Sequence, residues 1–285
     1  MKLAYHGATH MVSDLVTDIE VTGKSRFSAL EIWAKKIDPF LEKNTVSDLK
    51  RLLEDNGVEP VSLSSIEFVG FRGDEFGLIT DRCRELCETG QAIGCDTVVL
   101  VPSPIPDTSS DVAIDLCFPW ERVVEEYVDV LRTLSDVAKP YGTRLSFEFI
   151  GFHWCSVRTP RGAYEIVQAA DRDNLGINFD TCHFCGGGGN IEEIDSLDPS
   201  RICAFHINDM EDVPKEAYHD ARRLLPGEGC LPLDAICGRL RDIGFDGVCS
   251  VELFREEYYR LDPYDLADRA YEASAAVLSR YFKIE

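Results

Sequence analysis

The sequence is poor in basic residues. It contains 29 lysines and arginines against 51 aspartates and glutamates, which gives a formal net charge of −22. Binding to nucleic-acid phosphates or to an anionic membrane surface depends on clustered Lys and Arg side chains. We therefore expect neither partner, and we assign the acidity to a solvated outer surface.

Long apolar segments are also missing. No stretch approaches the roughly 20 apolar residues of a membrane span, and the opening MKLAYHGATHMVSDL lacks the apolar run of a signal peptide. Among the eleven cysteines, Cys182 and Cys185 form a CxxC that no second pair completes into a zinc site. Cys203 and Cys249 lie inside apolar runs, which is typical of buried thiols in a reducing compartment. We expect a cytoplasmic protein.

Short β-rich runs alternate with longer helical patterns along the whole chain. The strand candidates are residues 3–6, 29–33, 60–66, 97–102, 144–151, 175–180, 202–209 and 247–254. Helices are expected near 45–56, 74–93, 120–138, 161–170, 233–242 and 265–282. This α/β alternation predicts one (β/α)8 TIM barrel that spans residues 1–285 as a single domain. A doubly wound sheet is disfavoured because no Gly-rich fingerprint follows the first strand.

The last four expected strands alternate regularly between polar and apolar positions. The residues of one parity are Ser146, Glu148, Gly176, Asn178, Asp180, Ala204, His206, Asn208, Ser250 and Glu252, and the positions between them are apolar. Successive side chains of a strand point to opposite faces of the sheet. In a barrel the apolar set must face the surrounding helices, so the polar set faces the lumen.

Four ionisable residues of this polar set come one from each strand: Glu148, Asp180, His206 and Glu252. Neighbouring strands lie about 4.8 Å apart, so these side chains form an arc in the half of the barrel where barrel enzymes carry their chemistry. Each could be a separately satisfied core residue, but three crowded carboxylates repel one another unless a cation neutralises them. We therefore predict one divalent cation, with Mn²⁺ favoured and Mg²⁺, Co²⁺ or Zn²⁺ also compatible.

Phrases from nearly the whole chain resemble a known family. They are MKLAYHGAT, AKPYGTRLSFEFIG, GAYEIVQAADRDNLGINFDTCHF, FHINDMEDVP, RLLPGEG and LRDIGFDGVCSVELFREEYYRL, densest over residues 139–262. On these phrases the chain is identified as a member of the xylose-isomerase-like TIM barrels, the sugar phosphate isomerase/epimerase group. Within that group it is most similar to isomerases of keto-inositols, which belong to inositol catabolism.

The resemblance implies a metal quartet at the same four residues that the strand pattern selects. It also implies that His183, in the D-x-x-H motif, contacts a substrate oxygen and that Arg223, in RLLPGEG, binds substrate hydroxyls. Trp154 stands where the 3-epimerases of the group carry a glutamate, which favours a bulkier wall that stacks on a ring. His6, at the end of the first strand, is a further candidate for substrate binding.

The implied activity is isomerisation of a small keto-polyol or keto-sugar, with 2-keto-myo-inositol converted to 1-keto-inositol. Loss of the carbinol proton beside the ketone gives a cis-enediolate that a cation stabilises, and Glu148 and Glu252 are the expected acid/base pair. A dehydratase or C-glycoside-cleaving lyase acting on a keto-sugar, a ketose 3-epimerase and a non-catalytic sugar-binding barrel stay open. A homo-oligomer is compatible with the sequence. The sequence does not indicate which of the two glutamates removes the proton first.

Overall fold

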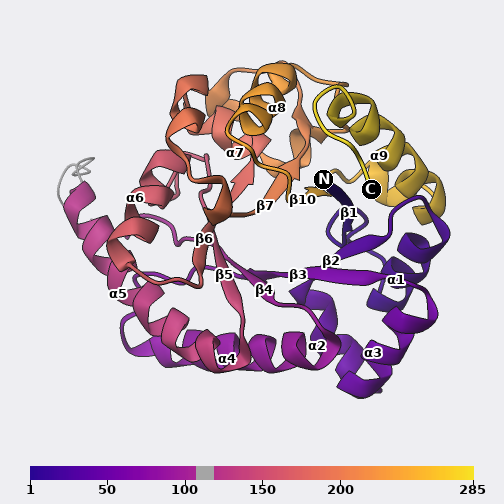
Figure 1. Ribbon diagram of the computed structural model, residues 1–285, viewed down its shortest axis with the longest axis horizontal. Helices are drawn as coiled ribbons and strands as arrows, with labels where there is room; N and C mark the ends of the chain where they lie inside the picture. Colours follow the sequence, from indigo (N-terminus) through magenta and orange to yellow (C-terminus); the bar gives the residue numbers. More distant parts are fainter. Residues whose placement is uncertain (107–118) are drawn as a thin grey trace.

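The computed structural model describes residues 1–106 and 119–285. Over these residues, eight parallel strands close into a barrel in the order β1-β10-β7-β6-β5-β4-β3-β2, with helices packed around it (Figure 1). The barrel strands are β1 (Lys2–His6), β2 (Ala29–Trp33), β3 (Glu59–Ile66), β4 (Thr97–Leu100), β5 (Arg144–Glu148), β6 (Leu175–Asp180), β7 (Ile202–Ile207) and β10 (Val248–Val251). The prediction of a TIM barrel is confirmed.

Helices lie between the strands and cover the outside of the barrel. They are α1 (Leu15–Lys24), α2 (Ile37–Leu41), α3 (Val46–Asp55), α4 (Phe76–Ile93), α5 (Trp120–Ala138), α6 (Pro160–Ala170), α7 (Thr181–Gly186), α8 (Leu233–Asp242) and α9 (Pro263–Leu278). The sequence analysis did not predict α1, α2 or α7. α1 is rich in valine, isoleucine and threonine, which favour strands in isolation, so packing of its buried face against the barrel decides its structure.

The ends of α3 show how the sequence fixes local structure. Thr45 precedes the helix and its hydroxyl accepts a hydrogen bond from the Asp48 N–H, while the Asp48 carboxylate accepts one from the Thr45 N–H. This reciprocal capping satisfies two backbone donors that the first helical turn leaves free. Gly57 follows the helix with φ +64°, a conformation that glycine adopts without steric cost.

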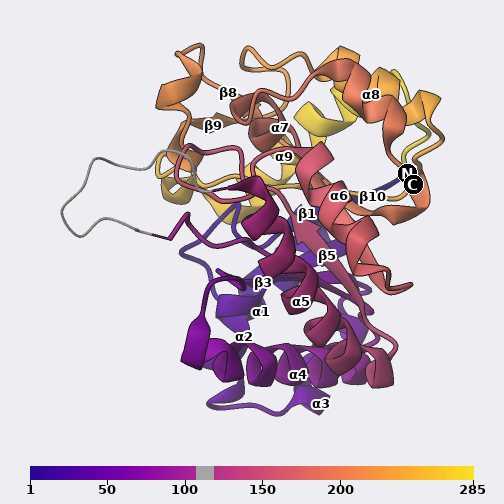
Figure 2. The same cartoon turned by 90° about the vertical axis from the view of Figure 1, so that its left-hand side faces the viewer.

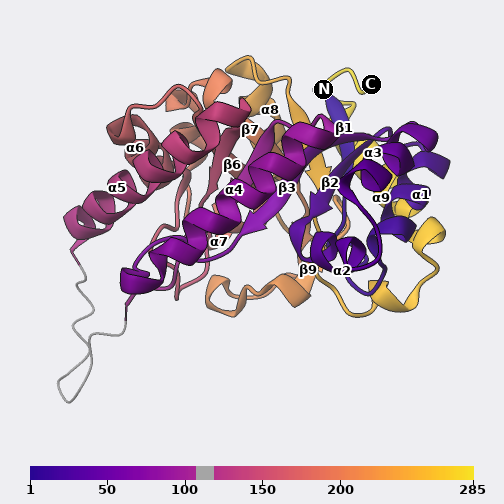
Figure 3. The ribbon, with the colours of Figure 1, turned by 90° about the horizontal axis from the view of Figure 1, so that it is seen from below.

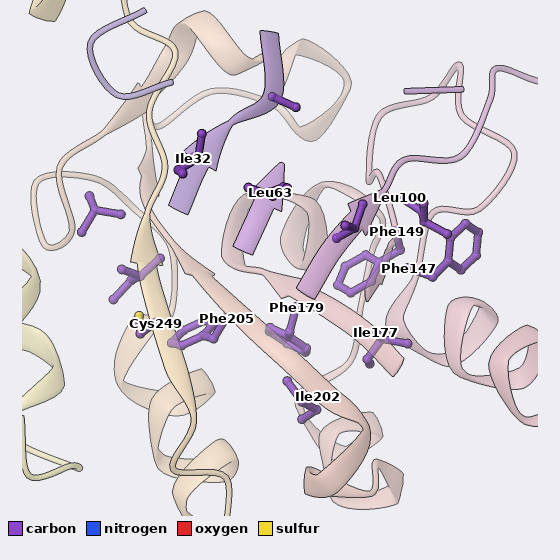
Figure 4. Close-up of a cluster of buried hydrophobic side chains, with 14 of the residues drawn as sticks. Ile32, Leu63, Leu100, Phe147, Phe149, Ile177, Phe179, Ile202, Phe205 and Cys249 are labelled. Carbon is purple, nitrogen blue, oxygen red and sulfur yellow. The ribbon is translucent and has the colours of Figure 1, made fainter. Parts of the chain in front are cut away.

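The apolar set of the strand pattern forms the layer between barrel and helices. Phe149, Phe179 and Phe205 come from neighbouring strands or their ends, and their ring centroids lie 5.7 and 6.0 Å apart (Figure 4). All three side chains are fully buried. Burial of one such side chain contributes about 1.5–3 kcal/mol, so this layer fixes the strand register and, with it, the polar set on the inner face.

A short antiparallel pair extends the chain beyond β7. It joins β8 (Asp209–Met210) to β9 (Arg223–Leu224), and it lies at the opposite end of the barrel from the two chain termini (Figures 2 and 3). The expected strand 202–209 therefore ends two residues early, and its last residue starts the new pair. In the described part of the chain, no helix has the length and apolar character needed to cross a membrane.

Candidate active site

The four predicted metal ligands converge at the carboxyl ends of their strands. Glu148, Asp180 and His206 lie in β5, β6 and β7, and Glu252 directly follows β10. One ligand atom from each residue lies within 4.8 Å of the others, and all four side chains are buried. The His206 Nδ1 atom lies 3.2 Å from Glu148 Oε1 and 3.2 Å from Glu252 Oε2. The strand pattern thus brings together the residues that it selected.

This cluster fits a divalent cation. Glu148 Oε1 is buried and accepts no well-aligned hydrogen bond, although His206 Nδ1 lies 3.2 Å away, and a cation would compensate for the lost hydration of this oxygen. Burial, with the repulsion of Glu252 and Asp180, raises the pKa of Glu148 to about 7. Burial also disfavours the charged form of Glu252, but His206 and Arg223 outweigh it and hold its pKa well below the ordinary value. Three carboxylates and one imidazole suit Mn²⁺, Co²⁺ or Zn²⁺.

The D-x-x-H motif has a structural explanation in helix α7. Asp180 is the residue before this helix, and its Oδ1 atom accepts a 2.7 Å hydrogen bond from the His183 N–H. The same carboxylate directs Oδ2 toward Asn208, whose amide donates to it at 2.7 Å. Asp180 therefore caps a helix with one oxygen and faces the cluster with the other. The three-residue spacing places the His183 N–H where it can donate to the capping oxygen.

Arg223 binds the quartet directly. Its Nη1 atom donates to Asp180 Oδ2 at 2.9 Å and to Glu252 Oε2 at 2.8 Å, and its Nη2 atom lies 2.8 Å from Asp220 Oδ1. The guanidinium is 1% exposed, so these carboxylates replace its lost hydration. Arg223 also lines the cavity described below. Its contact with substrate hydroxyls stays a prediction.

His183 is held by Arg223. The Arg223 Nη2 atom lies 3.0 Å from His183 Nε2, and a guanidinium can only donate, so this ring nitrogen is the acceptor. Burial lowers the pKa of His183, and the neutral ring then carries its proton on Nδ1. That N–H is buried and has no hydrogen-bond partner in the described structure. His183 is thus equipped to donate to an oxygen of a bound molecule.

A cavity of about 290 Å³ opens beside the cluster. Glu148, Glu252, His183 and Arg223 line it, together with the aromatic side chains Trp33, Phe68, Phe152, Trp154 and Phe254. The rings of Phe68 and Trp154 meet edge to face at 6.1 Å. Phe68 has φ +59°, which is rare for a bulky residue and typical of functional sites. A lining that contains both carboxylates and aromatic rings suits a polyol ring with an apolar C–H face.

His6 lies elsewhere than expected for a substrate contact. Its side chain is 0% exposed and is not among the residues that line the cavity. The His6 Nε2 atom lies 3.3 Å from Glu252 Oε1. His6 thus contacts a predicted metal ligand from within the barrel, and its binding of substrate stays a prediction.

Glu31 was not among the predicted site residues. This residue of β2 is fully buried in the barrel, and both of its carboxylate oxygens lie 3.1 Å from His206 Nε2. A signal was present, because a lone glutamate between Leu30 and Ile32 is the inward-facing residue of an otherwise apolar strand. The polar and apolar alternation that selected the quartet belongs to the last four strands and does not include β2.

Asp209 anchors the loop that follows Arg223. Its Oδ2 atom accepts hydrogen bonds from the N–H groups of Gly227 and Gly229, both at 3.0 Å, and its Oδ1 atom accepts from Leu231 at 2.9 Å. A fourth bond comes from Met210 at 2.9 Å. A buried carboxylate with four backbone donors fixes this loop, and the loop follows directly from the strand that carries the arginine.

Comparison with known proteins identifies the family of the chain. The family model described as "Xylose isomerase-like TIM barrel" matches residues 22–281. The chain belongs to this family. An inosose isomerase from Bacillus velezensis is 36% identical over 289 residues, and the match covers all of both chains. These full-length relatives confirm the prediction of an isomerase.

Solved structures of the family agree with the fold and with a metal site. A crystal structure described as the IolI protein with a bound zinc atom has a TM-score of 0.92 and 35% sequence identity, and covers 99% of this chain and 100% of its own. The family also includes more distant relatives. A D-psicose 3-epimerase from Ruminiclostridium cellulolyticum is 26% identical over 83% of this chain and 77% of its own.

Proposed function

We propose that this protein is a divalent-metal-dependent inosose isomerase that converts 2-keto-myo-inositol to 1-keto-inositol. One observation carries the proposal: the buried quartet borders a cavity in a chain that matches an inosose isomerase over its full length. The zinc atom named for the IolI structure supports a divalent cation at the quartet. The oxygen-rich donor set supports Mn²⁺ as the working ion.

The reaction moves a carbonyl by one carbon. The carbinol carbon beside the ketone loses its proton, and the electron pair of that C–H bond forms the C=C bond of a cis-enediolate. A proton then returns to the former carbonyl carbon, the proton of the neighbouring hydroxyl passes to the former carbonyl oxygen, and the new ketone forms at the neighbouring carbon. When bound, a divalent cation supplies Lewis-acid stabilisation of the negative charge on the two substrate oxygens.

Glu148 and Glu252 are our candidates for the proton transfers because both carboxylates line the cavity from different strands. Arg223 donates a 2.8 Å hydrogen bond to the Glu252 carboxylate, whereas Glu148 Oε1 accepts no hydrogen bond and has His206 Nδ1 3.2 Å away. His183 donates its free Nδ1–H to a substrate oxygen and so orients the ring of the substrate.

The aromatic side of the cavity supports a cyclic substrate. Trp154 and Phe68 stand edge to face at its wall, and aromatic rings pack well against the C–H faces of polyol rings. The polar groups of the quartet and these aromatic rings can thus bind the hydroxyls and the C–H groups of one ring. The same arrangement explains how the protein orients a molecule whose carbons carry nearly equivalent hydroxyls.

Incubation of the Mn²⁺-loaded protein with 2-keto-myo-inositol in D₂O, followed by NMR, tests the proposal. We expect 1-keto-inositol with deuterium beside its carbonyl. Exchange with loss of water would identify a dehydratase, release of an aglycone from a keto-glycoside a lyase, and an epimerised ketose a 3-epimerase. Absence of deuterium exchange in protein with bound metal would show that 2-keto-myo-inositol is not the substrate.

We further propose a cytoplasmic enzyme of inositol catabolism. The ten cysteines that the structure describes are all free, a state that a reducing compartment preserves. The net charge of −22 supports a small-molecule substrate without a nucleic-acid or membrane partner. Light scattering on the purified protein decides whether it forms a homo-oligomer.

A further inference from the structure

Glu31 lies behind the metal quartet, on the far side of His206 from the other carboxylates. It belongs to β2, which pairs with β1 in a register that places Glu31 opposite His6. Its carboxylate is 0% exposed and does not line the cavity. Burial of a carboxylate costs free energy unless the group is paired or hydrogen-bonded, so the contacts of Glu31 indicate its role.

The contact with His206 determines which ring nitrogen faces the quartet. Both Glu31 oxygens lie 3.1 Å from His206 Nε2, and a carboxylate can only accept a hydrogen bond. The Nε2 atom therefore carries a proton. In the neutral imidazole the lone pair then lies on Nδ1, the atom that stands 3.2 Å from both Glu148 and Glu252.

Asn178 does not change this assignment. Its amide nitrogen lies 3.0 Å from His206 Nδ1 and 3.2 Å from Nε2. Because an amide N–H donates, it cannot take the place of Glu31 as acceptor for the Nε2 proton. Among the described residues that contact Nε2, Glu31 is the acceptor that fixes the ring.

His6 is arranged in the opposite sense. Its Nδ1 atom accepts a hydrogen bond from the Ala8 N–H at 3.0 Å, so its proton lies on Nε2. That nitrogen stands 3.3 Å from Glu252 Oε1 and 3.7 Å from Glu31 Oε1. In this tautomer His6 has no lone pair to offer to a metal, although it stands beside one ligand. The inner end of the site therefore contains one acceptor, Glu31, and one donor, His6.

We propose that Glu31 is the positioning residue for the metal ligand His206. Its carboxylate binds Nε2–H, turns Nδ1 toward the quartet and draws the ring proton toward itself, which makes Nδ1 a stronger ligand. The inference rests on the proposed metal-dependent function and adds to its three carboxylate ligands a fourth carboxylate, which holds no metal but sets the affinity for one.

Metal affinity tests the proposal without an activity assay. Glu31→Ala removes the acceptor, and Glu31→Gln keeps a neutral one. Competition with a chelator should show Co²⁺ and Zn²⁺ binding weakened by about 10–100-fold in Glu31→Ala and by less in Glu31→Gln. The visible absorption of bound Co²⁺, which reports ligand geometry and strength, should shift in both variants.

Asp18→Asn is the matched control, because Asp18 is another buried carboxylate that pairs with a lysine away from the quartet. It should keep wild-type affinity and the wild-type Co²⁺ spectrum. If Glu31→Ala does not fold, Glu31→Gln decides alone. Wild-type affinity and spectrum in the folded Glu31 variants would overturn the inference only. A wild-type protein that binds no divalent cation would overturn the proposed function and the inference together.

Discussion

The loop that follows Arg223 depends on one carboxylate, so we expect Asp209→Asn to release it. In the native structure each Asp209 oxygen accepts two backbone hydrogen bonds. Asparagine offers one oxygen, and its NH₂ group would face two N–H donors in place of the other oxygen. The variant has almost the same volume, so the change isolates hydrogen bonding from packing.

The magnitude follows from those bonds. A hydrogen bond to a charged group contributes about 1.5–3 kcal/mol, so the loss of two gives about 3–6 kcal/mol. This is a large share of the roughly 5–15 kcal/mol that stabilises a typical domain. Gly229 packs closely against this carboxylate, because a Cβ atom at that position would lie 2.5 Å from Asp209 Oδ1.

Urea unfolding and amide hydrogen exchange measure the effect. Asp209→Asn should lower the free energy of unfolding and increase exchange at Gly227, Gly229 and Leu231, and it should lower kcat because Arg223 loses its support. Asp212→Asn, an exposed neighbour, is the control and should stay within about 0.5 kcal/mol of wild type. Wild-type unfolding energy and exchange in Asp209→Asn would refute the reasoning.

Four further predictions concern the site and the buried charges. Glu148→Gln and Glu252→Gln should each lower isomerisation by at least about 100-fold, measured by deuterium incorporation. Trp154→Ala should raise KM by about two- to tenfold with a smaller change in kcat, as loss of an aromatic contact of about 0.5–1.5 kcal/mol implies. Mn²⁺ added at about 100 times its Kd to EDTA-treated protein should raise the free energy of unfolding by about 2.7 kcal/mol. Burial raises the pKa of Asp18 from 3.8 to about 7, against the attraction of Lys36. Protonation of Asp18 therefore stabilises the folded state; this contribution is complete below about pH 4 and is lost as the pH rises through about 7. Wild type should lose stability relative to Asp18→Asn between these two pH values.

Each of these has a contrary result. Normal turnover in either glutamine variant with metal bound would show that this glutamate is not in the acid/base pair. An unchanged KM in Trp154→Ala would show that Trp154 does not stack on the substrate. A thermal transition indifferent to Mn²⁺ would argue against the quartet as a metal site. A pH-independent stability difference between wild type and Asp18→Asn would place the Asp18 pKa near its ordinary value.

The strand pattern predicted the barrel and the quartet because both depend on one local rule. Alternate residues of a strand face opposite sides, so an inward Glu148 or His206 could be recognised from its apolar neighbours. Glu31 obeys the same rule, but its strand carries one polar residue in five and resembles a core strand with a single exception. Its significance depends on His206, which is 175 residues away.

Other site residues follow no periodicity. Arg223 lies in a two-residue strand that pairs with the strand of Asp209 and Met210. Such a short strand carries no periodicity, so the resemblance to a family indicated Arg223 and the pattern did not. The depth of His6 was also beyond the pattern, since parity tells inward from outward and not how far along the barrel a side chain lies. Trp154 reaches the cavity from the loop after β5, where packing against Phe68 decides its place.

Asp180 joins two demands that narrow what evolution can place there. Capping α7 requires a short side chain, such as that of Ser, Thr, Asn or Asp, and the cluster requires a negative charge. Aspartate alone among these four meets both. Neither Glu148 nor Glu252 is the N-cap of a helix in the described residues, so their side chains meet only the demands of the cluster and its neighbours. Among the three acidic positions of the quartet, substitution should therefore be least tolerated at position 180. A glutamate there, longer by one methylene, would disturb both the N-cap of α7 and a metal ligand.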